Sequence, residues 1–568
     1  MTLSDSPYEV LKWPKPSGSL DGQFKKAAIA TDHGLCSEIG RDILFLGGNA
    51  VEATIASLIC IGVVNPQSSG LGGGFLMTIY NKTGQNCVTI NAREAAPIAS
   101  TQTMFVSNPK EATTGYKAIA VPSALHGLWI AYKEFASGKV SWRRLVEPSA
   151  ELAIDGFPVS SNLAETLMEK ESAIMADSSM RSTFVDPNTG KVYQEGDRLT
   201  RRTLGETLQM IANATDPSYL FYQGEVAKLI AAEMQENGGI ITLDDLNNYN
   251  TIIDRSPIEV PLLSKGLVMC GPPPPSSFAV TQLIVSIMAN FYDSSNYIDL
   301  NDPLIYHRLI EAEKFGYVLR SLLGDLPYVK DAATLVENMT SSSYTTWVKS
   351  LIMDNAQPIN YYSENPQYQK SDHGTSHVST IDQYGNAVSA TDTINLKLGA
   401  LRVSPKLGIV WNNEMDDFST PGMPNAFKIA PSPANFIQPG KRPMSSMSPT
   451  VIFDKRTGKV KMSVGASGGS YIISATAQTI IRSIVFNQTV KEAVDAPRLH
   501  NQYLPHVTQY ETAFPEEIIN DLRYRRGQKM VATNRQASTV QVIQAHDDGF
   551  IYGNSDFRRK TSTYAAGF

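Results

Sequence analysis

The segment from Ser371 to Ala400, SDHGTSHVSTIDQYGNAVSATDTINLKLGA, constrains the fold more than any other part of this sequence. Polar and apolar residues alternate on both sides of the turn-forming run DQYGN, which is typical of a β-hairpin. A connecting loop of about three or five residues places Thr375 opposite Thr393, so two threonine hydroxyls are predicted to lie side by side. Threonine is also an ordinary strand residue, and the pairing alone defines no function.

Gly374 comes immediately before this threonine, at the start of the predicted strand. A threonine hydroxyl is hardly ionised near neutral pH and needs a base to act as a nucleophile. Cleavage between Gly374 and Thr375 would provide one, since a free α-amino group has a pKa of roughly 7.7 to 8.0. Glycine also adds little bulk and allows strained backbone conformations at this bond. The alternative base is His377, which faces the same side of the strand, although a structural role is favoured.

Two further segments carry candidate chemistry. In WNNEMDDFS, Glu414 and Asp417 face one way if the backbone turns helically, so they could hold a substrate ammonium group. A solvated loop is the simpler interpretation, and a hard metal ion would need more oxygen ligands. In GASGGSYIISATAQTII, Gly468 and Gly469 lead directly into a predicted helix and could hold an oxyanion. Helix capping is the alternative there, and no lysine follows the glycines as a phosphate loop requires.

The remaining pattern indicates a layered α+β protein. A strand (KAAIATD), two helices (EIGRDILFLGG and AVEATIASLICIGVV) and a glycine-rich turn before the strand FLMTIY come first. Because these glycines precede a strand, they do not form a dinucleotide fingerprint. Residues 120–350 are mostly helical, with the proline run GPPPPSS at 271–277 as a rigid connector. Residues 355–374 form a long polar loop, and strands dominate after it.

Composition excludes some function classes. The chain has 568 residues and a formal charge of -6 with no long run of like charges, so nucleic acid is an unexpected partner. IASLICIGVV is about half the length of a membrane span, and residues 1–25 lack the apolar region of a signal peptide. The protein is therefore expected to be cytosolic, or its targeting segment is missing from this numbering.

Cysteine spacing matches no zinc pattern, and by itself it predicts one disulfide or none. Glycosylation sequons, which give a mild indication of secretion, occur at Asn81, Asn213, Asn338 and Asn487.

Taken in order, GTSHVS, SATDTINL, NNEMDDFS, SPANFIQPGKRPMSSMSP and GASGG closely resemble the γ-glutamyltranspeptidase (glutathione hydrolase) family in its animal form. NPQSSGLGGGF, NAREAAP and GPPPPSS extend the resemblance over nearly the whole chain. It implies a four-layer αββα sandwich of the N-terminal-nucleophile hydrolase type that needs no cofactor and no metal. It also implies self-cleavage before Thr375 into a large subunit, 1–374, and a small subunit, 375–568, which stay together as a heterodimer.

The same resemblance implies roles for individual residues. Thr375 would attack the γ-glutamyl carbonyl of glutathione or a related compound, with Thr393 bonded to the nucleophile and Gly468 and Gly469 holding the oxyanion. The glutamyl group would pass to water or to an amino-acid or dipeptide acceptor. The implied α-carboxylate ligands are Arg93, Ser445 and Ser446, and the implied α-ammonium ligands are Asn395, Glu414 and Asp417.

Cys36 and Cys60 resemble a family disulfide, whereas Cys87 and Cys270 receive no assignment. Family members of this kind face the cell exterior, often through an N-terminal anchor that this chain does not show. The expected protein is secreted, or anchored at the cell surface if such a segment is missing here. Two alternatives stay open: a non-enzymatic, venom-type relative with the same fold, and an acylase acting on a β-lactam side chain or another amide.

Overall fold

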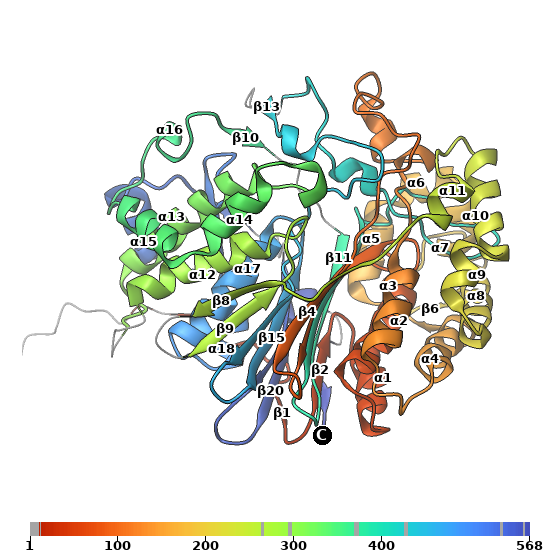
Figure 1. The fold of residues 1–568 in the computed structure, drawn as a ribbon, viewed down its shortest axis with the longest axis horizontal. Helices are drawn as coiled ribbons and strands as arrows, with labels where there is room; N and C mark the ends of the chain where they lie inside the picture. Colours follow the sequence, from red (N-terminus) through yellow and green to blue (C-terminus); the bar gives the residue numbers. More distant parts are fainter. Residues whose placement is uncertain are drawn as a thin grey trace, which may run out of the picture.

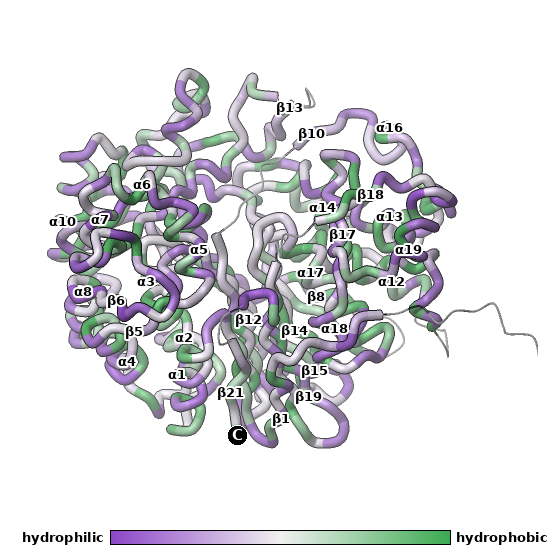
Figure 2. The backbone as a smooth tube through the Cα atoms, turned by 180° about the vertical axis from the view of Figure 1, so that it is seen from behind, coloured by the Kyte–Doolittle hydropathy of each residue, from purple (hydrophilic) through white to green (hydrophobic). Residues whose placement is uncertain are grey.

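Two seven-stranded antiparallel sheets lie face to face in the centre of the protein, and helices cover the outer face of each (Figure 1). The structure is a computed structural model that describes residues 11, 13–262, 266–292, 298–368, 374–424, 430–533, 538–560 and 563–568. Apolar runs follow the inner strands and the helix faces packed on them, while hydrophilic runs follow the periphery (Figure 2). The expected αββα sandwich is confirmed.

The first sheet contains the predicted hairpin. Its strand order is β21 (Ala566–Gly567), β2 (Ala28–Thr31), β11 (Gly374–Ile381), β12 (Ala387–Asn395), β3 (Gly74–Asn81), β4 (Asn86–Ala92) and β7 (Ile252–Asp254). Strands β11 and β12 pair with Thr375 opposite Thr393, as the hairpin register predicts. The buried pair β11 and β12 therefore runs through the middle of the sheet.

The second sheet has the order β1 (Gly22–Phe24), β20 (Ile551–Ser555), β19 (Thr539–Ala545), β15 (Lys459–Ser467), β14 (Thr450–Asp454), β9 (Leu267–Gly271) and β8 (Ile258–Leu262). Both sheets thus combine strands from before and after position 374. The parts of the chain on either side of that position share one core and are not separate domains.

Helices divide between the two outer layers. The layer on the first sheet includes α1 (Gly34–Phe45), α2 (Ala50–Val64), α3 (Ala124–Phe135), α4 (Trp142–Asp155) and α8 (Arg202–Asn213). The layer on the second sheet includes α12 (Phe278–Tyr292), α13 (Pro303–Arg320), α14 (Ala332–Thr340), α15 (Ser342–Leu351), α17 (Tyr471–Ile480) and α18 (Val490–Asp495).

Shorter elements complete the chain. The helices are α5 (Ser161–Glu169), α6 (Glu171–Ala176), α7 (Ser178–Phe184), α9 (Pro217–Tyr222), α10 (Glu225–Glu236), α11 (Leu243–Asn247), α16 (Ile359–Tyr362) and α19 (Glu516–Asn520). The strands are β5 (Phe157–Pro158), β6 (Arg198–Leu199), β10 (Gln367–Tyr368), β13 (Ala430–Pro431), β16 (Leu499–His500), β17 (Thr508–Glu511) and β18 (Met530–Thr533). The predicted loop 355–374 thus contains α16 and β10, and residues 369–373 lie outside the described ranges.

Helix α2 illustrates why the local sequence specifies this layering. Asn49 accepts a hydrogen bond from the Glu52 N–H, and the Glu52 carboxylate accepts one from the Asn49 N–H, so a capping box starts the helix. All its residues are buried because it is apolar on every side. Such a helix belongs between layers, and it packs on β11, α1 and α4. Within the described ranges, no helix combines the length and apolar character needed to cross a membrane.

Two disulfides form, so the expectation of at most one from spacing is wrong. Cys36 and Cys60 join α1 to α2, as the family resemblance implied. Cys87 on β4 and Cys270 on β9, which had no assignment, connect the two sheets across a sequence separation of 183. Spacing could not reveal this second bond, because sheet packing brings the two cysteines together.

We predict that replacing both Cys87 and Cys270 by alanine lowers stability more than the matched change at Cys36 and Cys60. Loop closure gives the reason: the separations are 183 and 24 residues, which correspond to about 5 and about 3 kcal/mol in the chain-entropy treatment. Thermal unfolding under non-reducing conditions measures the difference. Equal losses of Tm in the two double variants would contradict the expectation.

Candidate active site

The bond between Gly374 and Thr375 lies at the edge of the buried hairpin, with one hydrogen-bond donor on each side of it. The Thr393 hydroxyl donates to the Gly374 carbonyl oxygen at 2.6 Å. The Gly468 N–H donates to the Thr375 hydroxyl oxygen at 2.9 Å. Both threonines are buried, with 3% and 2% of their surface exposed. The structure therefore brings together Gly374, Thr375, Thr393 and Gly468, four of the predicted residues.

Glycine at position 374 is required by close packing. A Cβ atom there would lie 2.5 Å from the Asn395 carbonyl oxygen, well inside van der Waals contact. The strand register also shifts between Gly374 and Thr375, so the ladder is irregular at this bond. Gly468 and Gly469 both have positive φ angles, 120° and 62°, a region that glycine adopts readily. They lead from β15 into α17, which aims the Gly468 N–H at Thr375.

His377 is a structural residue between the two sheets. Its Nδ1 is 2.8 Å from the Thr391 hydroxyl and its Nε2 is 3.1 Å from the Ser379 hydroxyl. Burial lowers the pKa of His377 to about 3, so the ring is neutral. Gly465 on β15 makes room for it, since a Cβ there would lie 2.2 Å from the ring. Both ring nitrogens are occupied, and this geometry gives no support to the alternative that His377 activates Thr375.

Arg559 and Asp32 adjoin Thr375 and were not anticipated from the sequence. Arg559 Nη2 donates to the Thr375 carbonyl oxygen at 3.3 Å and forms a short ion pair with Asp32. Asp32 Oδ2 also accepts the His377 N–H at 3.3 Å, and its Oδ1 accepts from Gln541 at 2.6 Å. Asp32 follows β2 and precedes α1. An acidic residue between a predicted strand and a predicted helix is the sequence signal that could have identified it. The location of Arg559 near the chain end gave none.

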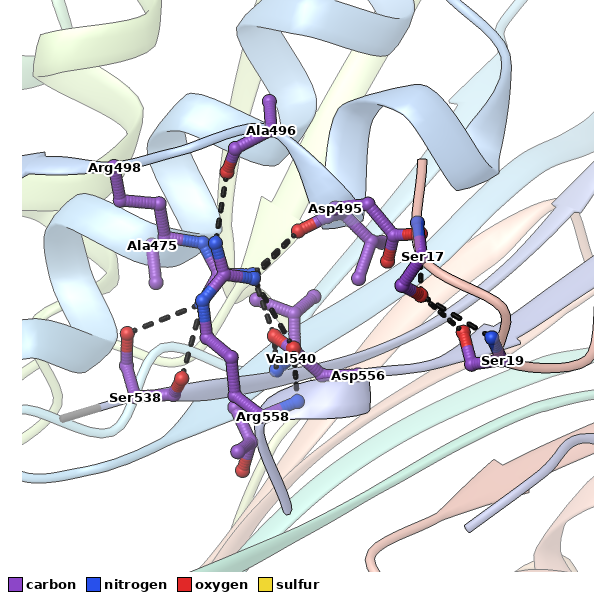
Figure 3. Close-up of polar contacts among 12 residues, drawn as sticks. Ser17, Ser19, Ala475, Asp495, Ala496, Arg498, Ser538, Val540, Asp556 and Arg558 are labelled. Atoms are coloured by element: carbon purple, nitrogen blue, oxygen red, sulfur yellow. Dashed lines mark hydrogen bonds and ion pairs between the residues drawn. The ribbon is translucent and has the colours of Figure 1, made fainter. Parts of the chain in front are cut away.

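A buried ion network braces the segment that carries Arg559 (Figure 3). Asp556 pairs with Arg498 at 2.5 Å and with Arg558 at 3.1 Å. The Asp556 carboxylate is fully buried, and the two arginines balance its negative charge. Ser17 near the chain start donates to Asp495 at 2.8 Å in the same region. The network holds the turn immediately before Arg559, whose guanidinium contacts the Thr375 carbonyl oxygen.

A second charged cluster lies around Arg93, whose side chain is fully buried. Its Nη1 is 2.5 Å from Glu414 Oε1 and 3.6 Å from Glu94, and its Nη2 forms a short ion pair with Asp417. Its Nε donates to the Pro443 carbonyl at 3.3 Å, two residues before the predicted serine pair. The guanidinium and the carboxylates predicted to bind opposite ends of an amino acid thus contact one another.

Charge in this cluster favours a ligand that carries an ammonium group. One guanidinium faces three carboxyl groups, and burial raises the pKa of Glu94 to about 7 despite the nearby Arg93. Asn395, on the strand end next to Gly374, adds an acceptor: its Oδ1 is buried and has no hydrogen-bond partner among the described residues. A zwitterionic head group can exchange ion pairs with Arg93 and the carboxylates.

Asp392 lies on β12 beside Thr393 but faces the helical layer. Ser69 donates a short hydrogen bond to its Oδ2, and burial raises the pKa of Asp392 to about 8. Together with Arg201 it lines an otherwise mainly apolar cavity between α2 and α8. Arg201 donates to the Gly62 carbonyl at 2.7 Å. A buried acid beside Thr393, the strand partner of Thr375, was not anticipated from the sequence.

The layers and the buried threonine at the head of β11 are the architecture of the N-terminal-nucleophile hydrolases. Residues 36–566 match the sequence profile described as gamma-glutamyltranspeptidase. The chain belongs to the γ-glutamyltranspeptidase family. Among curated relatives, it is 39% identical over 557 residues to Scoloptoxin SSD14 of Scolopendra dehaani, covering 97% of this chain and 94% of that protein. It is 39% identical over 537 residues to Glutathione hydrolase 2 of Arabidopsis thaliana, with coverages of 92% and 89%.

Solved structures show the same fold. A cephalosporin acylase from Bacillus halodurans superposes with a TM-score of 0.83 over 100% of this chain and 99% of that chain. At 23% identity this likeness shows the fold alone. The γ-glutamyltranspeptidase of Helicobacter pylori is 31% identical, with a TM-score of 0.53, over 57% of this chain and 92% of that chain.

We predict that Asp392→Asn flattens the dependence of stability on pH. The carboxyl stays protonated in the folded protein up to about pH 8 but ionises near 3.8 when unfolded. Its contribution to stability is therefore complete below pH 3.8 and is lost as the pH rises to about 8. At pH 8 the amide variant should be more stable by on the order of 5 kcal/mol. Unfolding measured from pH 4 to 8 tests this, and parallel curves for the two proteins would refute it.

Proposed function

We propose that this protein cuts itself between Gly374 and Thr375 and then acts as a γ-glutamyltransferase and glutathione hydrolase. One observation carries the proposal: the Thr375 hydroxyl accepts from Gly468 while the preceding carbonyl accepts from Thr393. A nucleophile and the carbonyl it would attack are thus each held by a donor, with both threonines excluded from solvent. Membership of the family supports the same reaction class.

In the self-cleavage step, the Thr375 hydroxyl oxygen attacks the Gly374 carbonyl carbon. The Thr393 hydroxyl stabilises the negative charge that develops on the carbonyl oxygen. The peptide C–N bond breaks, an ester forms on the Thr375 oxygen, and the hydroxyl proton passes to the new amino group. Water then hydrolyses the ester, which leaves a carboxylate on Gly374 and a free amine on Thr375. The products 1–374 and 375–568 stay associated because each sheet contains strands of both fragments that pair directly with one another.

In the cleaved enzyme, the Thr375 α-amino group takes the proton from its own hydroxyl. The oxygen attacks the γ-carbonyl of glutathione or another γ-glutamyl compound, and the N–H groups of Gly468 and Gly469 stabilise the oxyanion. The amine leaving group departs with the proton, and the glutamyl group remains as an ester on Thr375. Water, an amino acid or a dipeptide amine then accepts the glutamyl group.

The Arg93 cluster would select the amino-acid end of the donor. Arg93, Ser445 and Ser446 bind the α-carboxylate, while Glu414 and Asp417, helped by Asn395, bind the α-ammonium. When the substrate binds, its α-carboxylate replaces the two acids as the partner of Arg93, and its ammonium group replaces Arg93 as the partner of the acids. Every buried charge therefore keeps a partner of opposite sign. Recognition of both α-groups leaves the γ-carbonyl as the bond to be cut.

A non-enzymatic role is the second candidate, favoured by the 39% identity to a protein named as a scoloptoxin. The intact Gly374, Thr375 and charged cluster count against it. A denaturing gel separates the two: an active chain runs as two bands and an inert relative as one. An acylase for another amide is excluded if glutamate is released from a γ-glutamyl anilide.

The proposal extends to location and modification. We place the protein in a secreted or cell-surface setting, because disulfides such as the two here persist in oxidising compartments. The sequon asparagines are all exposed, as glycan attachment requires: Asn81, Asn213, Asn338 and Asn487.

We predict that Thr375→Ala stays as one chain and shows no γ-glutamyl transfer, because the attacking oxygen is gone. Thr375→Ser, which keeps the hydroxyl, should still be cut and active at a reduced rate. N-terminal sequencing of the smaller wild-type band should read Thr-Ser-His-Val-Ser. A different first residue, or normal processing of the alanine variant, would rule out the proposed nucleophile.

We predict that Arg93→Lys raises KM for a γ-glutamyl anilide at least tenfold. Lysine keeps the positive charge but cannot pair in two directions as the guanidinium does, and a charge-assisted hydrogen bond contributes about 1.5–3 kcal/mol. The variant should still be cut, since Arg93 does not contact Gly374 or Thr375 in the described structure. An unchanged KM in a correctly processed variant would show that Arg93 does not bind the donor.

A further inference from the structure

The proline run at 271–277 lies against the serine segment at 443–449 and supports it. The Ser445 N–H donates to the Pro275 carbonyl at 2.7 Å, and the Ser277 N–H donates to the Met447 carbonyl at 3.0 Å. The Ser277 hydroxyl also donates to the Ser445 carbonyl at 2.6 Å. The run is therefore more than a connector between β9 and α12, because it fixes the backbone that carries Ser445 and Ser446.

Arg320, the last residue of α13, joins these two segments. Its Nε donates to the Ser277 hydroxyl oxygen at 3.1 Å, and its Nη2 donates to the Ser446 hydroxyl oxygen at 3.0 Å. The residue is only 5% exposed, so the guanidinium acts with little screening by water. A positive charge is thus held directly behind the serine pair, on the helix that packs beneath it.

The direction of these hydrogen bonds determines where the serine protons can go. A guanidinium only donates, so the Ser446 oxygen accepts from Arg320 and its own proton remains to be donated elsewhere. The Ser445 oxygen likewise accepts from the Met447 N–H at 3.2 Å. Both serines are fully buried, and among the described residues neither hydroxyl is found donating.

Buried donors are stabilised by an acceptor, so these two O–H groups are available to donate to a ligand oxygen. Two adjacent O–H donors match the two oxygens of a carboxylate. Arg93 lies near this serine pair, because its Nε donates to the carbonyl oxygen of Pro443, two residues before Ser445.

We propose that Arg320 is a positioning residue for donor recognition: it occupies the acceptor side of the Ser446 hydroxyl and thereby directs the Ser446 proton toward the α-carboxylate of the substrate. This rests on the proposed function and assigns a second arginine, behind the serines, to the carboxylate end of the site. Arg320 itself does not touch the substrate. Its effect passes through Ser446, with Ser277 holding the other edge of the guanidinium.

The test is a double-mutant cycle of Arg320→Met and Ser446→Ala on the processed enzyme, with a γ-glutamyl anilide as donor. Inhibition constants are measured for L-glutamate and for 4-aminobutanoate, which is glutamate without its α-carboxylate. Each single change should raise KM and the glutamate inhibition constant about tenfold and leave kcat within about twofold. The constant for 4-aminobutanoate should not change, and the double variant should be no worse than Ser446→Ala alone.

Ser277→Ala is the second variant, in case Arg320→Met is not processed. It removes the hydrogen bond that Arg320 Nε donates to the Ser277 hydroxyl, so it should weaken glutamate binding by a smaller factor and again spare 4-aminobutanoate. Additive losses in the cycle, or equal losses for both inhibitors in any of these variants, would overturn the proposal. Failure of the proposed function would be seen separately, as absence of anilide cleavage by the wild-type protein.

Discussion

The pairing of β11 with β12 is the constraint on which the rest of this structure depends. It places Thr393 beside the bond between Gly374 and Thr375, and it positions β11 where Gly468 can reach the nucleophile from the second sheet. A slip of one residue would turn Thr375 toward the helical layer and Ser376 toward Gly468. The buried side chains between the sheets, among them His377 packed against Gly465, oppose such a slip. Core packing and chemistry therefore specify the same register.

The two arginines of the site are each paired with carboxylates. Arg93 is paired with Glu414 and Asp417, while Arg559 is paired with Asp32 next to Thr375. Arg93 is fully buried and Arg559 is mostly buried, so an unpaired charge at either position would be unfavourable. Such pairs keep the cluster in one arrangement before a substrate enters, and a zwitterion can replace them without net change in charge. The ligand-free site is thus preorganised by its own opposite charges.

Much of the local structure could be predicted from sequence because the signals are local. The register of the hairpin follows from its turn, the limits of α2 follow from an apolar run, and the Gly468 turn follows from glycines before a helix. Arg559, Arg320 and Asp392 could not be found in this way, because their partners are distant in sequence and no periodic pattern marks them. The bond between Cys87 and Cys270 was missed for the same reason, since it depends on how two sheets pack. Family resemblance supplied Arg93 and the serines, whose own local signals are weak.

Each sheet contains strands from both sides of position 374, which has a consequence for the protein after a cut at that position. Strands β11 and β12 of the smaller fragment pair with β2 and β3 of the larger fragment in the first sheet, and β20 and β14 pair with β1 and β9 in the second. Separating the fragments would require breaking both sheets, which is global unfolding and not dissociation of a docked pair. Dilution should therefore not release them, and a fragment made alone would expose open strand edges prone to aggregation. A single translated chain that is divided only after folding avoids that hazard, because the strand edges that the two fragments share are already paired when the backbone opens.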